Sequence, residues 1–205
     1  MKAPASAPAP RRATTSHLLY LHGFRSSPQS TKARMLAAWV GHHRPDLVWW
    51  CPQLPASPAK AIDILLDHLA GWPAEGRAVI GSSLGGFYAT VLAERLDCPV
   101  VLLNPAIDPA RDLAAYAGSV KAWHSDDSFE FEPTFVDELR DLTPARIEHL
   151  DNYLVVIAKG DEVLDWREMS ARYAGCSQLM LEGSDHALSD FDRQLPVVLD
   201  ALGLR

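Results

Sequence analysis

The chain alternates between short runs of consecutive apolar residues and longer stretches in which apolar residues recur every three or four positions. Six runs are of the first kind, and we expect them to form strands: residues 17–21, 47–51, 77–80, 100–103, 153–158 and 177–181. Continuous apolar runs are typical of strands covered on both faces, as in parallel sheets. Amphipathic helices are predicted over residues 32–40, 59–69, 87–96 and 191–202. The alternation predicts an α/β fold with a six-stranded, mostly parallel sheet and helices on both faces.

Composition indicates a folded protein with one sizeable core and argues against two classes of partner. Of the 205 residues, 48% are apolar and 22% are charged, which is the balance of a globular domain. The formal net charge is −7, and no cluster of Lys or Arg occurs. We therefore expect neither nucleic acid nor an anionic membrane surface as a partner. No apolar run approaches the roughly 18 residues that a membrane span requires.

The cysteines and the N-terminal residues favour a cytoplasmic protein. Cys51, Cys98 and Cys176 are odd in number and form no C-x-x-C pair, which favours free thiols in a reducing compartment. Residues 1–16 are rich in Ala and Pro and are expected to form a disordered tail, with a single domain from 17 to 205. A twin-arginine export signal at residues 11–12 is the alternative, although the apolar stretch after it has only five residues.

One long segment interrupts the alternation of strands and helices. Residues 105–149 contain no convincing strand, and they carry ten acidic but only four basic side chains. Plain connections in compact domains are far shorter, so an insertion of this length usually has a function. We expect a small acidic lid over a site, and a solvated helical surface without such a role is the alternative.

The sequence Gly81-Ser82-Ser83-Leu84-Gly85 directly follows a predicted strand and directly precedes a predicted helix. Glycines on both sides of a serine at this spacing permit a sharp strand-to-helix turn, which raises the middle side chain above the sheet. Ser83 has this spacing, whereas Ser82 has Ile80 in place of the first glycine. The motif predicts that Ser83 is a nucleophile, and a plain glycine-rich turn is the alternative.

A serine hydroxyl needs a base to remove its proton and a third group to orient that base. Among the eight histidines, His186 lies in a loop between the last predicted strand and the last predicted helix, at the carboxyl edge expected for Ser83. Asp161 follows the fifth predicted strand at the same edge and is the first candidate for the acid, with Asp165 second. Asp185 is adjacent to the histidine and fits a turn residue better. The chain order serine, aspartate, histidine is the order that this architecture uses for acyl transfer.

Backbone N–H groups at two turns are candidates for stabilising the negative charge of a tetrahedral intermediate. One belongs to Leu84, directly after the serine, and the other to Phe24 or Arg25 in the turn after the first strand. The Arg25 side chain, with Lys32 and Arg34 just beyond it, is a candidate for binding a carboxylate or phosphate of a substrate. Solvated surface charge is the alternative.

Five blocks of the sequence together carry a resemblance to a known family. They are LYLHGFRSSP at 19–28, IGSSLGGFYA at 80–89, LNPA at 103–106, KGDEVLD at 159–165 and GSDHA at 183–187. They resemble the YqiA-like esterases, a compact branch of the α/β-hydrolase superfamily, over about residues 17–202. The resemblance implies a compact α/β-hydrolase fold that lacks the two leading antiparallel strands of larger members, with strand order 2-1-3-4-5-6. It also favours Asp161 over Asp165, because the family's acid directly follows the glycine of its Gly-Asp-Glu-Val-Leu-Asp block.

Residues and resemblance together predict a serine esterase that cleaves small carboxylic esters through an acyl-enzyme, with Ser83, Asp161 and His186 as the triad. The resemblance implies that no cofactor is needed. A thioesterase acting on acyl-CoA or other thioesters is the nearest alternative, and a non-catalytic binding protein with the same fold is a more distant one. A metal-dependent hydrolase would need clustered ligands, of which residues 124–127 are a weak example.

Overall fold

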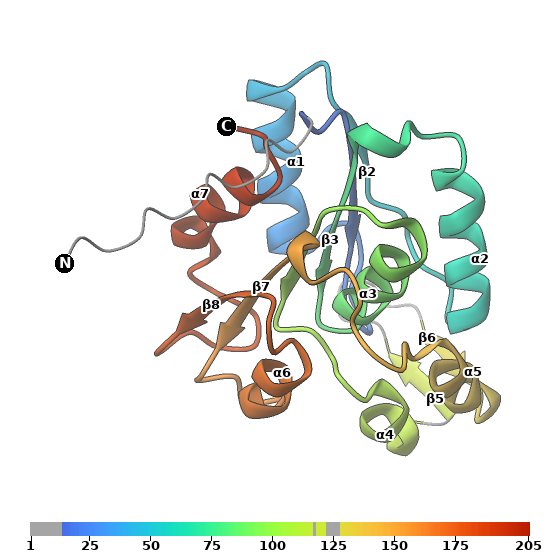
Figure 1. Ribbon diagram of the computed structural model, residues 1–205. Coiled ribbons are helices and arrows are strands. Elements are labelled where there is room, and N and C mark those ends of the chain that lie inside the picture. Colours follow the sequence, from blue (N-terminus) through green and yellow to red (C-terminus); the bar gives the residue numbers. More distant parts are fainter. Residues whose placement is uncertain (1–13, 117, 122–127) are drawn as a thin grey trace.

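Six parallel strands form the central sheet of the computed structural model, which describes residues 14–116, 118–121 and 128–205 (Figure 1). In spatial order the strands are β2 (Val48–Trp50), β1 (His17–Leu21), β3 (Arg77–Ser82), β4 (Val100–Leu103), β7 (Tyr153–Ala158) and β8 (Ser177–Leu181). All neighbouring pairs are parallel. The six predicted strands and their order are confirmed, although β2 is two residues shorter and β3 two residues longer than expected.

Helices cover both faces of this sheet, as the alternation predicts. They are α1 (Thr31–His43), α2 (Pro58–Leu69), α3 (Leu84–Leu96), α4 (Pro109–Leu113), α5 (Thr134–Leu142), α6 (Trp166–Arg172) and α7 (Phe191–Ala201), with 3-10 turns at Ala74–Gly76, Ala114–Tyr116 and Leu150–Asn152. Helices α1 and α7 pack on one face, and α2, α3 and α6 pack on the other (Figure 1). Within β1, Leu19 and Leu21 belong to one core, and Leu18 and Tyr20 belong to the other. This two-sided burial explains why the strand is a continuous apolar run.

The segment between β4 and β7 differs from the prediction because it contains two strands. Strands β5 (Gly118–Lys121) and β6 (Ser128–Phe131) pair antiparallel as a separate small sheet, so the expectation of a segment without strands is wrong. Phe131 at the end of β6 is 1% exposed, and its ring centroid lies 5.5 Å from that of Phe24 and 5.6 Å from that of Phe135. Packing between residues far apart in the chain stabilises β6. The strand was not predicted because four residues in an acidic stretch show too short a pattern to indicate a strand.

The last two residues of the predicted tail, Thr15 and Ser16, form hydrogen bonds with the rest of the domain. The side chain of Thr15 is buried and donates a hydrogen bond to the Leu202 carbonyl, and the Ser16 N–H donates to the Gly76 carbonyl at 2.8 Å. Thr15 and Ser16 therefore pack with the domain, whereas residues 1–13 of the predicted tail lie outside the described residues. The weak metal-ligand group at 124–127 also lies outside them. Across the described ranges, no helix combines the length and the apolar character needed to cross a membrane.

Candidate active site

Ser83 lies between β3 and α3 in a backbone conformation that few residues other than glycine adopt. Its φ is 56° and its ψ is −122°, and its side chain does not cap the helix. The neighbouring backbone holds this turn: the Ser83 N–H donates to the Leu103 carbonyl, and the Ser83 carbonyl accepts from the Ala106 N–H, each at 3.0 Å. A conformation of this kind costs about 1–3 kcal/mol and persists only where the surroundings impose it. The turn presents the hydroxyl to the loops at the carboxyl edge of the sheet.

Three glycines permit this turn because a side chain at any of them would collide with neighbouring atoms. A Cβ atom at Gly81 would lie 2.2 Å from the Gly85 carbonyl oxygen, and one at Gly85 would lie 2.1 Å from the Leu21 carbonyl oxygen. At Gly86 the added atom would lie 2.8 Å from Cβ of Pro105. The start of α3 therefore packs directly against the end of β1 and the loop after β4, which fixes the serine above the sheet.

The structure brings Ser83, Asp161 and His186 together at the carboxyl edge of the sheet, after β3, β7 and β8 respectively. Nε2 of His186 lies 3.1 Å from Oγ of Ser83, and Nδ1 of His186 lies 2.7 Å from Oδ2 of Asp161. The Asp161 side chain is fully buried, and that of His186 is 13% exposed. A carboxylate that accepts from Nδ1–H leaves Nε2 as the nitrogen that can take the serine proton. The three side chains form one continuous hydrogen-bonded chain.

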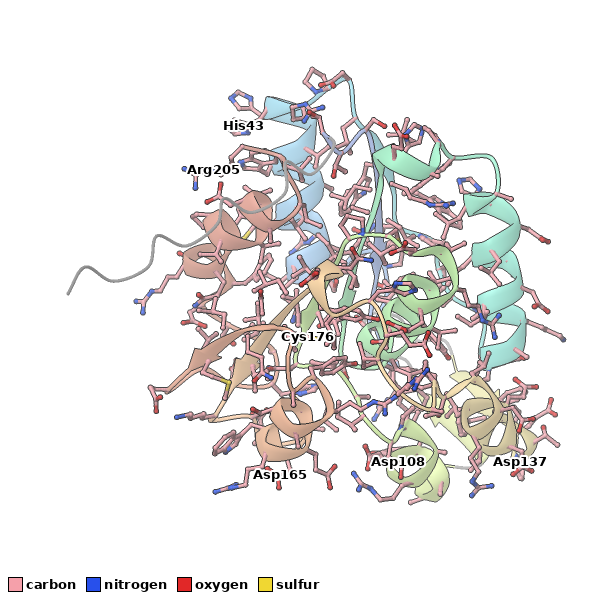
Figure 2. All side chains as sticks on the ribbon, in the orientation of Figure 1. His43, Asp108, Asp137, Asp165, Cys176 and Arg205 are labelled. Carbon is pink, nitrogen blue, oxygen red and sulfur yellow. The ribbon has the colours of Figure 1, made fainter. Side chains whose placement is uncertain are left out.

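The second oxygen of Asp161 is also occupied, which fixes the orientation of its carboxylate. Oδ1 accepts hydrogen bonds from the backbone N–H groups of Val163 and Leu164, each at 2.8 Å. Asp165, the second candidate for the acid, instead accepts from the Arg167 N–H at 2.9 Å and caps the start of α6 (Figure 2). Of these two candidate aspartates, Asp161 is the one that contacts the histidine.

Two charged side chains hold the loop that carries His186. The His186 N–H donates to Oε2 of Glu162 at 3.0 Å. The ammonium group of Lys32, on the first turn of α1, donates a hydrogen bond to the carbonyl of Ala187. These contacts attach the histidine loop both to the loop after β7 and to the first turn of α1.

Asn104, in the loop after β4, connects the histidine loop to the end of β7. Its side chain is completely buried; Nδ2 donates to the carbonyls of Asp185 and His186 at 3.1 and 3.2 Å, and Oδ1 accepts from the Ala158 N–H at 2.8 Å. Asp185 accepts from the N–H and the hydroxyl of Ser189, as expected of a turn residue. Sequence reasoning assigned no role to Asn104. Its position directly after a predicted strand, at the edge that carries the triad, was the available signal.

The turn after β1 lies against the serine, where the second oxyanion donor is predicted. A Cβ atom at Gly23 would lie 3.1 Å from Cβ of Ser83, so the backbone of this turn passes close to the serine. Phe24 and Arg25 follow in this turn, and Arg25 has a positive φ of 60°. Leu84 is the first residue of α3, where N–H groups have no acceptor within the helix. Both predicted donors therefore belong to turns beside Ser83.

A cavity of about 710 Å³ lies over Ser83 and His186. Most of its lining is apolar and comes from the turn after β1, from α4 and the 3-10 turn after it, and from the loops after β7 and β8. Charged side chains of the lining are Arg25, Lys32 and Asp112. The cavity is thus a mostly apolar space that contains the Ser83 hydroxyl and has two cations and one carboxylate in its wall.

His22 and the other candidate ligands among the described residues are not part of the hydrogen-bonded chain of Ser83, His186 and Asp161. Within the described ranges, no group of three or more His, Cys, Asp or Glu side chains is arranged to hold a metal ion. His22 is buried, and its Nδ1 lies 3.0 Å from the Gly23 carbonyl oxygen, a contact that stabilises the turn after β1.

Solved structures with the same architecture are hydrolases and esterases of low sequence identity. Mouse α/β-hydrolase domain-containing protein 10 has a TM-score of 0.69 at 13% identity, covering 93% of this chain and 92% of that chain. A structure described with the metagenome-derived lipolytic enzymes LipS and LipT has a TM-score of 0.67 at 20% identity, covering 93% and 94%. The esterase domain of a Rhodothermus marinus protein has a TM-score of 0.63 at 18% identity, covering 95% and 88%. These similarities establish the α/β-hydrolase fold.

The sequence also matches a family model over nearly the whole domain. The match spans residues 17–202, and the model is that of the uncharacterised protein family UPF0227. It includes all five sequence blocks that carry the resemblance and all three residues of the hydrogen-bonded chain. The chain therefore belongs to UPF0227, the YqiA-like family, and has the α/β-hydrolase fold.

Proposed function

We propose that this protein is a serine hydrolase that cleaves small carboxylic esters through an acyl-enzyme. The observation that carries the proposal is the hydrogen-bonded chain from Ser83 through His186 to Asp161, with distances of 3.1 and 2.7 Å. The positive φ of Ser83 supports it, since it leaves the hydroxyl exposed to the cavity and not committed to capping α3. Esterase and lipolytic relatives of the same fold support the reaction class.

In the first half of the proposed reaction, Oγ of Ser83 attacks the ester carbonyl carbon while Nε2 of His186 takes the hydroxyl proton. His186 then gives this proton to the departing alcohol oxygen as its bond to the carbonyl carbon breaks, which leaves Ser83 acylated. In the second half, water attacks the acyl carbonyl, and His186 transfers a proton from that water to Oγ as the carboxylic acid leaves. Asp161 keeps the imidazole in the required tautomer and stabilises its cationic form.

We assign the oxyanion of each tetrahedral intermediate to the backbone N–H groups of Leu84 and Phe24. The support is their location on two turns that both adjoin Ser83, one at the start of α3 and one next to Gly23. An N-terminal helix position adds a favourable partial positive charge. Losing one such donor typically costs about 2.7–4 kcal/mol of barrier.

We propose residues 105–149 as the lid of this site, acting together with Arg25 in substrate binding. Pro109, Leu113 and Tyr116 from this segment line the cavity, and the Tyr116 ring packs against Phe24 with centroids 5.4 Å apart. A lining of this kind suits a small apolar acyl group.

A panel of 4-nitrophenyl esters and matching thioesters of graded acyl length tests the function. We expect the intact protein to hydrolyse short esters, and Ser83→Ala to lose several orders of magnitude in kcat while keeping its fold. Activity should be unchanged in chelator. A strong preference for thioesters would favour the thioesterase alternative. Binding of these compounds without turnover would indicate a binding protein.

A further inference from the structure

We infer that the substrate of this site carries an anionic group, a carboxylate or a phosphate, that pairs with the Lys32 ammonium in the wall of the cavity. The inference rests on the proposed hydrolase function and adds a substrate class to it. Sequence reasoning considered Arg25 for this role, but Lys32 has the surroundings that call for an anionic partner.

Lys32 is a partly buried cation whose hydrogen bond goes to a neutral group, the carbonyl of Ala187. Burial lowers the pKa of Lys32 to about 8, although the nearby carboxylates of Asp185 and Asp161 act in the opposite direction. In the described part of the chain, no carboxylate lies within ion-pair distance of this ammonium. A charge withdrawn from water without a counterion is unfavourable, so an anion beside it would be bound favourably.

The carboxylates nearest to Lys32 form their hydrogen bonds with other groups. Asp161 is bound to the histidine and to two backbone N–H groups, and Asp185 is bound to the N–H and the hydroxyl of Ser189. Oδ1 of Asp112, the acidic side chain in the cavity lining, accepts from Nε of Arg111 at 2.8 Å, and its buried Oδ2 has no hydrogen-bond partner among the described residues. Among the described residues, none of these carboxylates forms an ion pair with Lys32 that a substrate anion would have to displace.

The donor capacity and the position of Lys32 fit a ligand in the cavity. An ammonium group has three donors, and one of them is occupied by the Ala187 carbonyl. Lys32 lines the same cavity as Ser83 and His186, and Arg25 adds a second cation to that lining. Two cations against one carboxylate in the lining give the cavity a local positive charge, which favours an anionic group there although the whole protein carries a net charge of −7.

Substrate pairs that differ only in charge test the inference. One pair is 4-nitrophenyl hydrogen adipate and its neutral isostere 4-nitrophenyl 6-methylheptanoate. The other is S-butyryl-4′-phosphopantetheine and S-butyryl-pantetheine, which lacks only the terminal phosphate. The measured quantity is the ratio of kcat/KM for the anionic member to that for the neutral member. We expect a ratio above one in one pair, which identifies the anion as carboxylate or phosphate. Lys32→Met should lower that ratio about tenfold, the effect of losing one charge-assisted hydrogen bond.

Three further variants separate charge from structure. Lys32→Arg should keep most of the ratio, and Lys32→Gln, which removes the charge but can still donate to the Ala187 carbonyl, should lower it as Lys32→Met does. Arg34→Met is the matched control, because Arg34 is an exposed cation on the same helix outside the cavity lining, and its ratio should equal that of the wild type.

A ratio of one in both pairs, or a ratio that Lys32→Met and Lys32→Gln leave unchanged, would overturn the inference. Equal losses on both members of a pair would also overturn it, since Lys32 would then act only by holding the histidine loop. Failure of the hydrolase proposal gives a different result, namely the absence of Ser83-dependent turnover with every substrate, and it would refute both.

Discussion

Replacing Asp161 by asparagine tests how the carboxylate controls the histidine. In the native site, Oδ1 accepts from the N–H groups of Val163 and Leu164, and Oδ2 accepts from Nδ1–H of His186. An amide offers one acceptor oxygen and one donor NH₂ group. The two backbone donors select the oxygen, so the NH₂ group faces the histidine and donates to Nδ1. The imidazole proton then resides on Nε2, and a protonated Nε2 cannot accept the proton of Ser83.

The size of the effect follows from the cost of restoring the productive tautomer. Turning the amide around would set its NH₂ group against two backbone N–H groups, and the carboxylate of Asp161 is fully buried. Leaving a buried donor unsatisfied costs about 1–3 kcal/mol, so two of them cost about 4 kcal/mol. At 1.36 kcal/mol for each tenfold change in rate, kcat should fall about 10³-fold.

The assay is steady-state hydrolysis of an ester that the wild type cleaves, with Asp165→Asn as the matched control. Asp165 lies four residues away and caps α6, so its variant should lose some stability but keep kcat within a few-fold of the wild type. Asp161→Asn should lower kcat with little change in KM. A variant that kept more than a tenth of wild-type kcat, or equal losses in both variants, would refute the assignment of Asp161.

Three further predictions concern residues around the triad. Asn104→Ala removes the three hydrogen bonds of a buried side chain. It should lower the free energy of unfolding in urea by about 3 kcal/mol and lower kcat far more than KM. Unchanged kinetics would contradict a positioning role for Asn104. Gly85→Ala should prevent native folding, because its Cβ would lie 2.1 Å from the Leu21 carbonyl oxygen, and a wild-type Tm would contradict this. The pKa of Lys32 is about 8 in the folded protein and 10.5 in the unfolded chain. The free energy of unfolding of the wild type, relative to that of Lys32→Met, should therefore rise between pH 8 and pH 10.5. A difference between the two proteins that does not change with pH would argue against the burial of Lys32.

The sheet was predictable because burial on both faces leaves a local trace in the sequence. Leu18 and Leu19 are consecutive and pack into different cores, so both positions require an apolar side chain. The apolar run is continuous for this reason. Parallel strands also bring their carboxyl ends to one edge, which is why residues after β3, β7 and β8 could be expected to lie close together. The structure brings Ser83, Asp161 and His186 into contact there.

What the sequence did not reveal depends on contacts between distant residues. Strand β6 is stabilised by Phe131 against Phe24 and Phe135. Thr15 and Ser16 donate hydrogen bonds to the Leu202 and Gly76 carbonyls respectively. Asn104 bridges two loops whose separation in space no spacing along the chain reports. Asp161 ranks before Asp165 because it comes first after the strand, and the family resemblance strengthens that ranking; only the contact with His186 separates the two aspartates directly.

Covalent labelling of Ser83 tests the account's central claim most directly. The protein is treated with a fluorophosphonate, and the modified residue and the labelling rate are read by mass spectrometry. We predict labelling at Ser83 in the wild type and in Ser82→Ala, none in Ser83→Ala, and a rate lowered by orders of magnitude in His186→Ala, because the base would be missing. Labelling at another residue, or an equal rate in His186→Ala, would contradict the claim that Ser83 is a nucleophile activated by His186.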